Sequence, residues 1–133
     1  MHHVAIMKKS WGLIPKVLSG EKTIESRWYK NKSAPWDRIA KGDTVWFKNS
    51  GEPVIARAKV EKVLQFQDFA PKVVREIYAK YGEAIGVPKE KHAKWAKDKI
   101  VNKKRYCIIM FLTNPRKVSP YRIDKKGFGN AAA

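Results

Sequence analysis

Residues 18–28 constrain the fold of this chain more than any other segment, because they join a helix end to a strand. Gly20 can adopt the positive φ at which helices often stop, and an extended pattern begins shortly after it. Successive side chains of a strand alternate between its two faces. One face would carry Thr23, Glu25 and Arg27, and the other Lys22, Ile24 and Ser26. Ile24 can then enter a core while Glu25 and Arg27 stand side by side.

The same segment has the form Gly-x-Lys-x-x-Glu-x-Arg behind a short helix, and it resembles the signature of the ASCH domain, a branch of the PUA-like superfamily. Its position after a first strand and helix makes the motif more specific than the short pattern alone. The resemblance covers most of the chain, including the Lys41-Gly42-Asp43 turn before a Trp/Phe strand and the long strand near residues 54–63. It implies an α+β fold, namely a small mixed PUA-like β-barrel with flanking α-helices. It also implies a cleft beside the Gly-x-Lys element that is usually assigned to RNA binding.

Apolar periodicity places the remaining elements along the chain. Strands are predicted at residues 3–7, 22–28, 44–48, 54–64, 105–113 and 118–123. Helices are predicted at 11–18, at 71–81 with Gly82 ending it, and at 89–100. A chain of 133 residues is long enough for one core but too short for two domains. We therefore expect a single domain over residues 1–127, with 128–133 as a disordered tail.

The charge balance calls for an explanation beyond solubility. Lys and Arg number 29 against 12 acids, for a net charge of +17. A field of this sign concentrates polyanions, so nucleic acid is the first partner to consider and an anionic membrane surface the second. The alternative is a solvated surface in an organism with a basic proteome, since 22 of the 29 bases are Lys. We expect RNA as the partner, with DNA as a possible competitor.

Other patterns exclude several classes of protein. The single cysteine, Cys107, rules out an internal disulfide, and its apolar surroundings predict a buried strand residue and not a nucleophile. No apolar run approaches the length of a membrane span, and the start lacks the pattern of a signal peptide. There is no phosphate-binding Gly-rich loop, no cysteine pair and no His/carboxylate spacing typical of a metal site. We expect a cytoplasmic monomer with no membrane partner, no metal and no cofactor.

Lys22, Glu25 and Arg27 are the first candidates for a site. In a binding site, the two bases would hold phosphates or base edges while Glu25 accepts from an exocyclic amine. In a hydrolytic site, Lys22 with a pKa depressed by Arg27 could act as a base on a hydroxyl or water. A surface ion pair between Glu25 and Arg27 would have little energetic consequence. The resemblance favours a functional cleft.

The resemblance also implies a hydrolytic alternative, because some small bacterial relatives look like amidohydrolases acting on N4-acetylcytidine. Lys22 matches their motif lysine, but Glu25 stands where their pattern has Thr, which puts that specific activity in doubt. In this alternative, which includes a ribonuclease, Lys22 and Glu25 are the catalytic candidates. A further catalytic Glu would lie later in the chain, and four positions stay open: Glu61, Glu76, Glu83 and Glu90.

Residues 89–105 form a strongly basic stretch, in which eight Lys/Arg side chains accompany two acids and Trp95. Phosphate neutralisation by Lys together with stacking on an exposed aromatic is the usual physics of RNA binding. A solvated helix face with Trp95 in the core would explain the same pattern. We predict that the bases of this stretch meet phosphate: Lys91, Lys94, Lys97, Lys99, Lys103, Lys104 and Arg105.

A loop after the motif combines aromatics with bases. Its candidate binding residues are Trp28, Tyr29, Lys30, Lys32 and Trp36. Core packing explains any one of these aromatics, but several together in a polar segment favour base stacking, and the loop is predicted to wall the cleft. The sequence thus predicts an RNA-binding domain with a barrel-side cleft and a basic surface segment. A hydrolase is the alternative, and a protein-interaction module is a third possibility.

Overall fold

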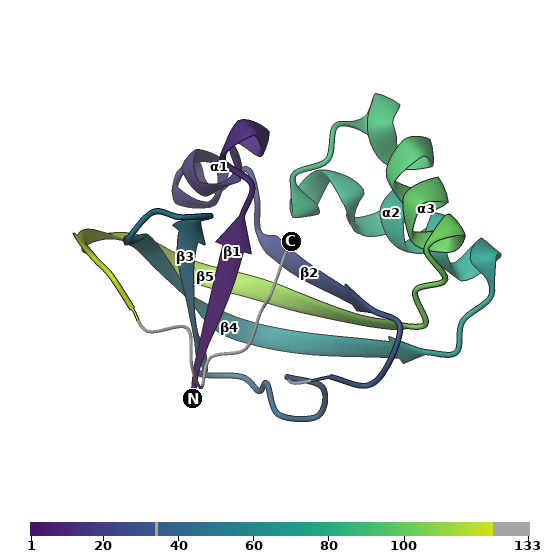
Figure 1. Cartoon of the computed structure of the whole chain (residues 1–133), viewed down its shortest axis with the longest axis horizontal. Coiled ribbons are helices and arrows are strands. Elements are labelled where there is room, and N and C mark those ends of the chain that lie inside the picture. The colour runs from purple at the N-terminus through teal and green to yellow at the C-terminus, as the bar shows by residue number, and fades with distance from the viewer. Residues whose placement is uncertain (34, 124–133) are drawn as a thin grey trace.

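A computed structural model describes residues 1–33 and 35–123, so the tail expected at 128–133 and the domain boundary at 127 lie outside the described residues. The strands are β1 (His2–Met7), β2 (Ile24–Tyr29), β3 (Thr44–Asn49), β4 (Val54–Gln67) and β5 (Tyr106–Tyr121). The helices are α1 (Leu13–Ser19), α2 (Pro71–Ile85) and α3 (His92–Val101), with 3-10 turns η1 (Lys9–Trp11) and η2 (Lys89–Lys91). The predicted α+β class is confirmed (Figure 1).

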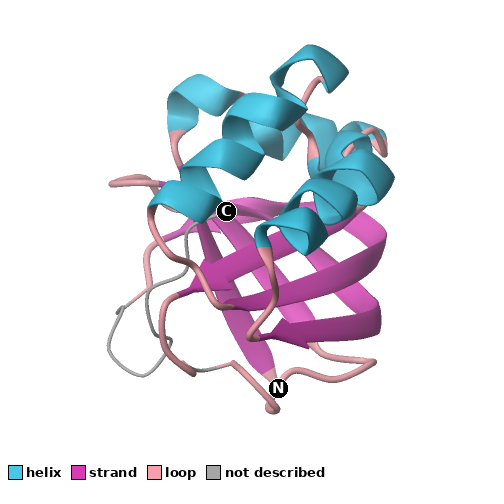
Figure 2. Ribbon diagram, turned by 90° about the vertical axis from the view of Figure 1, so that its right-hand side faces the viewer, coloured by secondary structure: helices cyan, strands magenta, loops and turns pink. Residues whose placement is uncertain are grey.

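The five strands form one sheet in the order β1-β3-β4-β5-β2, in which only β1 and β3 run parallel. Figure 2 shows the strands curling beneath the helices. Within the described residues, however, β1 and β2 are edge strands that do not pair. The predicted β-barrel is therefore wrong in this respect, because the sheet is not closed. A side chain bridges the edges instead, since Arg27 Nη2 donates to the Val4 carbonyl at 2.7 Å.

Two hydrophobic cores share strand β2, which is buried on both faces. Glu25 and Arg27 pair in register with Met110 and Ile108 of β5, which belong to the core inside the curve of the sheet. Ile24 and Trp28 belong to the second core, which packs the sheet against α2 and α3. Because β2 is buried on both faces, its polar side chains are buried as well. The charged groups of Glu25 and Arg27 therefore lie inside the protein.

The last two predicted strands are one continuous strand, β5. Asn114-Pro115 interrupts the pattern locally without ending the strand, and Asn114 adopts a φ of 53°. Lys59 pairs with Thr113 and Arg57 with Arg116, so the turn-like dipeptide sits in a bulge. The strand continues beyond the bulge because β4 is long enough to keep pairing with it.

Helix α2 passes through Gly82, which was predicted to end it, and stops at Gly86, where φ is 103°. A Cβ built on Gly82 would lie 2.5 Å from His92 Nε2 of α3. That nitrogen also lies 2.9 Å from the Val87 carbonyl, in a hydrogen bond that fixes the ring. The glycine therefore serves the close approach of α3, a role that the sequence pattern does not distinguish from a helix end.

The predicted helix at residues 11–18 divides at Gly12, which has a φ of 63°, into η1 and α1.

Cys107 is buried on β5 as expected, and burial raises the pKa of its thiol well above the usual value. In the part of the chain that the structure describes, no helix has the length and apolar character needed to cross a membrane.

Candidate functional site

Lys22, the motif lysine, is buried and fully engaged. Its Nζ donates to the carbonyls of Ile24 and Ile85, each at 2.6 Å, and lies 3.2 Å from Glu25 Oε1. These contacts tie the start of β2 to the C-terminal end of α2. Lys22 acts as an internal clamp between sheet and helix.

Glu25 and Arg27 are buried beside this clamp. Neither carboxylate oxygen of Glu25 accepts a hydrogen bond from the described residues, and Lys22 is its ion-pair partner among them. Arg27 Nε likewise has no hydrogen-bond partner there, although its Nη2 is bonded to Val4. Buried polar atoms without partners are uncommon and costly, so this charged cluster depends strongly on its ion pair.

Two expectations about the motif are corrected by this geometry. Lys22 lies before the first residue of β2, so strand alternation does not apply to it, and its ammonium reaches Glu25 instead of pointing to the other face. The pKa of Lys22 is lowered, as the hydrolytic hypothesis required, but the main cause is burial. Glu25 opposes that shift and Lys16 adds to it, and Arg27 is not among its causes.

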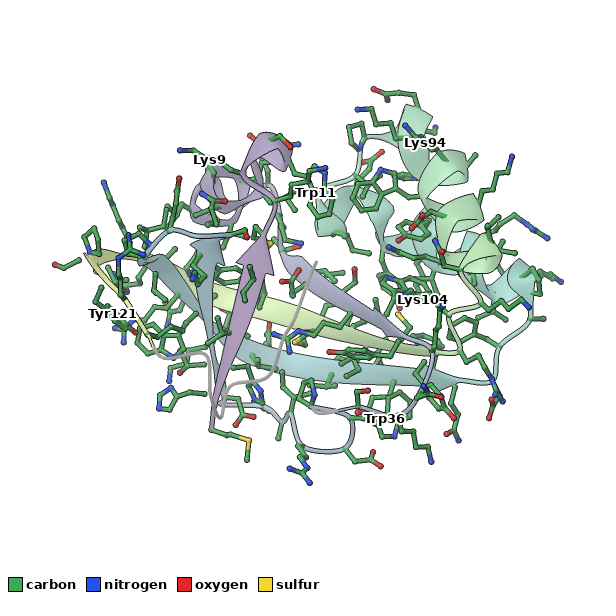
Figure 3. The ribbon with its side chains drawn as sticks, in the orientation of Figure 1. Lys9, Trp11, Trp36, Lys94, Lys104 and Tyr121 are labelled. Carbon is green, nitrogen blue, oxygen red and sulfur yellow. The ribbon has the colours of Figure 1, made fainter. Side chains whose placement is uncertain are left out.

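A cleft of about 490 Å³ opens between the η1–α1 segment and α3, and its lining includes Ile85, whose carbonyl accepts from Lys22. Figure 3 shows Trp11 and Lys94 on the helical side of the molecule. The lining residues are Ser10, Trp11, Leu13, Lys16, Ile85, Gly86, Val87, Pro88, Lys91, Lys94, Trp95, Asp98 and Lys99. Lys22, Glu25 and Arg27 do not line the cleft.

Gly86 forms the connection between the cleft and the motif. A Cβ at this position would lie 2.9 Å from Leu13 Cδ2 and 3.5 Å from Lys22 Cδ. The neighbouring Ile85 carbonyl is the acceptor that holds Lys22. The motif therefore supports Ile85 and Gly86 of the cleft lining without being part of that lining.

Two tryptophans from distant parts of the chain meet at the cleft. Trp11 and Trp95 are half-buried, and their ring centroids lie 5.2 Å apart in an edge-to-face arrangement. The Lys99 ammonium lies 5.4 Å from the centroid of Trp95 and 3.4 Å from an Asp98 carboxylate oxygen. Burial lowers the pKa of Lys99, while Asp98 opposes that shift.

Three other lysines give the cleft its charge. Within residues 1–33 and 35–123, Lys16, Lys91 and Lys94 form no ion pair, whereas Lys99 shares its charge with Asp98. The cleft therefore combines indole rings with uncompensated ammonium groups.

The basic stretch at residues 89–105 is only partly gathered at the cleft. Lys91, Lys94 and Lys99 line it, as does Trp95, which is half-buried and not wholly in the core. The other predicted bases lie outside the lining: Lys97, Lys103, Lys104 and Arg105. Arg105 pairs instead with Asp68.

The loop after the motif does not wall the cleft, contrary to expectation. Trp28 is buried and stacks on Tyr78, with ring centroids 5.5 Å apart and planes 4° from parallel. Trp36 contacts Tyr106 and packs against the core inside the curve of the sheet, away from α2 and α3 (Figure 3). Lys30 and Lys32 are exposed, and Tyr29 is half-buried against the first core; none of the three lines the cleft. Base stacking by Trp28 would require its ring to leave the core.

Trp11 and Lys16 are cleft residues that the sequence analysis missed. Trp11 begins an apolar helical spacing, which indicates a core residue, and Lys16 is one lysine among many. The informative feature is the contact between Trp11 and Trp95, which joins segments far apart in the sequence. No local pattern reports such a contact.

Beside the motif, His3 forms a buried pair with Asp43, with 2.9 Å between Nε2 and Oδ2. Burial lowers the pKa of His3; the hydrogen bond to Asp43 opposes this and the charge of Arg27 adds to it. Burial by itself raises the pKa of Asp43, but hydrogen bonds from His3 and the Ala40 N–H help to hold it below 3.8. The two shifts therefore act in different pH ranges.

The lowered pKa of His3 predicts a loss of stability in mild acid. As the pH falls below about 6.5, histidine in the unfolded chain takes up a proton that the folded protein resists. The unfolded state then binds more protons, so the free energy of unfolding decreases between about pH 7 and pH 5. Urea denaturation across this range should show the decrease in the wild type and a flatter profile in His3→Gln. Equal slopes in the two proteins would contradict the assignment.

Comparison with protein-family models finds no match, and comparison with curated proteins finds none that is significant. Among solved structures, ASCH from Zymomonas mobilis superposes with a TM-score of 0.64 at 17% identity, over 93% of this chain and 75% of that one. The ASCH domain from Lactobacillus crispatus gives 0.50 at 11% identity, over 84% and 79%. The N-terminal domain of Staphylothermus marinus McrB gives 0.50 at 14% identity, over 91% and 76%. These likenesses show the fold, and the ASCH resemblance is confirmed at that level.

Proposed function

We propose that this chain, which has the fold of ASCH-domain structures, binds RNA through the cleft between Trp11 and Trp95. The observation that carries the proposal is the meeting of two half-buried tryptophans, over a single cleft, with three lysines that form no ion pair among the described residues. A protein that binds unpaired nucleotides needs cations for the phosphates and aromatic surface for the bases. The net charge of +17 would speed the encounter with a polyanion.

In this proposal, the cations at the mouth of the cleft contact the phosphates and the indoles contact a base. Lys91 and Lys94 are exposed on the α3 side, and Lys16 lies on α1 across from them. A phosphate between the two helices could thus approach ammonium groups from both sides. The buried motif would act indirectly, by holding Gly86 and the cleft floor in place. The preference for RNA over DNA rests on the ASCH resemblance.

The hydrolytic alternative has no comparable support from the geometry. Lys22 donates to two carbonyls and pairs with Glu25, so its nitrogen is committed and does not line the cleft. The candidate second carboxylates do not line it either: Glu61, Glu76, Glu83 and Glu90. We therefore place Lys22 in the structural support of a binding site.

Fluorescence-anisotropy titrations of a short single-stranded RNA at several salt concentrations test the proposal. The triple variant Lys16→Ala/Lys91→Ala/Lys94→Ala should bind more weakly by tenfold or more. Each phosphate contact on a single strand contributes about 0.7 to the magnitude of the slope of log K against log salt. Loss of three contacts should therefore reduce that magnitude by about 2.

Lys30→Ala/Lys32→Ala/Lys41→Ala is the matched control, because it removes the same charge from exposed positions outside the cleft. It should retain most of the wild-type slope. Equal losses in the two triple variants would mean that net charge and not the cleft governs binding. Unchanged binding in the first variant would also rule out the cleft.

A further inference from the structure

A second group of aromatic and basic side chains lies on the outer face of the sheet, at the end far from α3. Figure 3 shows Tyr121 at the opposite end of the molecule from Lys94. We propose that this outer-sheet surface, formed by His2, Trp46, Arg57, Arg116 and Tyr121, is a separate binding site for single-stranded nucleic acid. It shares no residue with the lining of the cleft, so the two sites can be tested independently.

Strand pairing brings these side chains together. In register, Trp46 of β3 lies opposite Arg57 of β4, and Arg57 lies opposite Arg116 of β5. The neighbours of Arg57 on its own strand, Ala56 and Ala58, are buried in the core. Alternation therefore turns Arg57 to the outer face, and the row across three strands presents one indole and two guanidinium groups.

Trp46 is held in a fixed orientation within this surface. Its indole Nε1 donates to His2 Nδ1 at 2.9 Å, and the Cζ of Arg57 lies 5.8 Å from its ring centroid. Tyr121 contacts it edge-to-face, with centroids 5.9 Å apart and planes at 75°. Trp46 is half-buried while Tyr121 is 41% exposed, so the tryptophan supports a phenol ring that is open to solvent.

The charge of the surface favours a polyanion. Arg57, Lys59, Arg116 and Lys117 are exposed, and across the described ranges none of them forms an ion pair. Lys59 donates to Thr44 Oγ1 at 2.7 Å, which keeps its ammonium beside the row. An acidic peptide would use the bases alone, whereas a single strand uses the bases for phosphate and the exposed ring for stacking. The combination therefore points to nucleic acid.

Substitutions on the surface test this site. Tyr121→Ala should weaken binding of single-stranded oligouridine and oligothymidine about tenfold, because stacking on an aromatic contributes this order of affinity per base. Tyr121→Phe keeps the ring and should bind within about twofold of the wild type. Arg57→Gln/Arg116→Gln should lower the magnitude of the salt slope by about 1.4, or about 0.7 for each phosphate contact.

Photo-crosslinking identifies which peptide contacts the oligonucleotide, which an affinity alone does not report. An oligonucleotide carrying a photoreactive thiouridine should attach to the peptide containing Tyr121, and Lys16→Ala/Lys91→Ala/Lys94→Ala should leave that product unchanged. If the triple variant loses only the crosslinks to peptides of the cleft, the two sites are separate. If the triple variant loses binding while Tyr121→Ala binds normally and gives the same products, the proposed function survives and the outer-sheet site fails.

If instead Tyr121→Ala loses binding while the triple variant binds normally, the cleft proposal fails and the outer-sheet site is supported. An acidic peptide, polyglutamate, provides the remaining arm of the experiment. If polyglutamate binding depends on Tyr121 while oligonucleotide binding does not, the surface is a protein-docking site and the proposal is overturned.

Discussion

Replacing Lys22 by methionine should lower the free energy of unfolding by about 3–5 kcal/mol, because it leaves the Glu25 carboxylate buried without its cation. Lys22 and Glu25 side chains have no exposed surface, so water cannot replace the lost partner without local opening. The Ile24 and Ile85 carbonyls lose their donor as well. Urea denaturation followed by tryptophan fluorescence would measure the loss.

Two companion variants separate this explanation from general damage. Lys16→Met makes the same chemical change at a half-buried lysine without an ion pair in the described residues, and should cost no more than about 0.5 kcal/mol. The double variant Lys22→Met/Glu25→Leu removes the stranded charge and should recover part of the loss, although the two carbonyls stay unpaired. A loss below about 1 kcal/mol in Lys22→Met would show that the pair is not isolated from water.

Replacing Gly82 by alanine should destabilise the protein by about 1–3 kcal/mol, although glycine to alanine within a helix ordinarily stabilises by about 1 kcal/mol. The added Cβ would lie 2.5 to 2.8 Å from three ring atoms of His92. Turning the ring away would break the hydrogen bond from Nε2 to the Val87 carbonyl. If the ring stays, helices α2 and α3 have to separate, which also displaces Trp95 and the α3 side of the cleft.

Ala79→Gly is the matched control, since Ala79 is exposed in the same helix and the exchange is the reverse. It should cost about 1 kcal/mol through helix propensity alone. Gly82→Ala/His92→Ala should be more stable than Gly82→Ala if the ring is the obstacle. A stabilised Gly82→Ala protein would mean that α3 does not pack this closely.

Short-range patterns in the sequence were enough to locate most of the secondary structure. The apolar spacing of residues 71–81 predicted α2, although three-dimensional packing decided that it continues to Ile85. Alternation along 54–64 predicted β4, and the apolar surroundings of Cys107 predicted its burial. These features depend on neighbours within a few residues, which a linear pattern reports directly.

The sequence also indicated that Glu25 and Arg27 share a face of β2, but not that this face is interior. Their burial depends on the curl of the sheet, which brings β1 close enough for Arg27 to bond with Val4. The family resemblance implied a β-barrel, whereas the sheet is open among the described residues, with β1 and β2 at its edges. The family resemblance was correct about the fold, but the residues it favoured for a cleft, Lys22, Glu25 and Arg27, are buried and do not line the cleft.

The candidate site was decided almost entirely by tertiary structure. The sequence alone determined that the chain is strongly basic, folds as a mixed α+β domain and places its motif at the start of β2. Only the folded protein brings Trp11 to Trp95 and directs the Lys22 ammonium to Glu25. Such contacts depend on how loops close and on which charges the packed cores force together, and neither leaves a periodic trace in the amino-acid sequence.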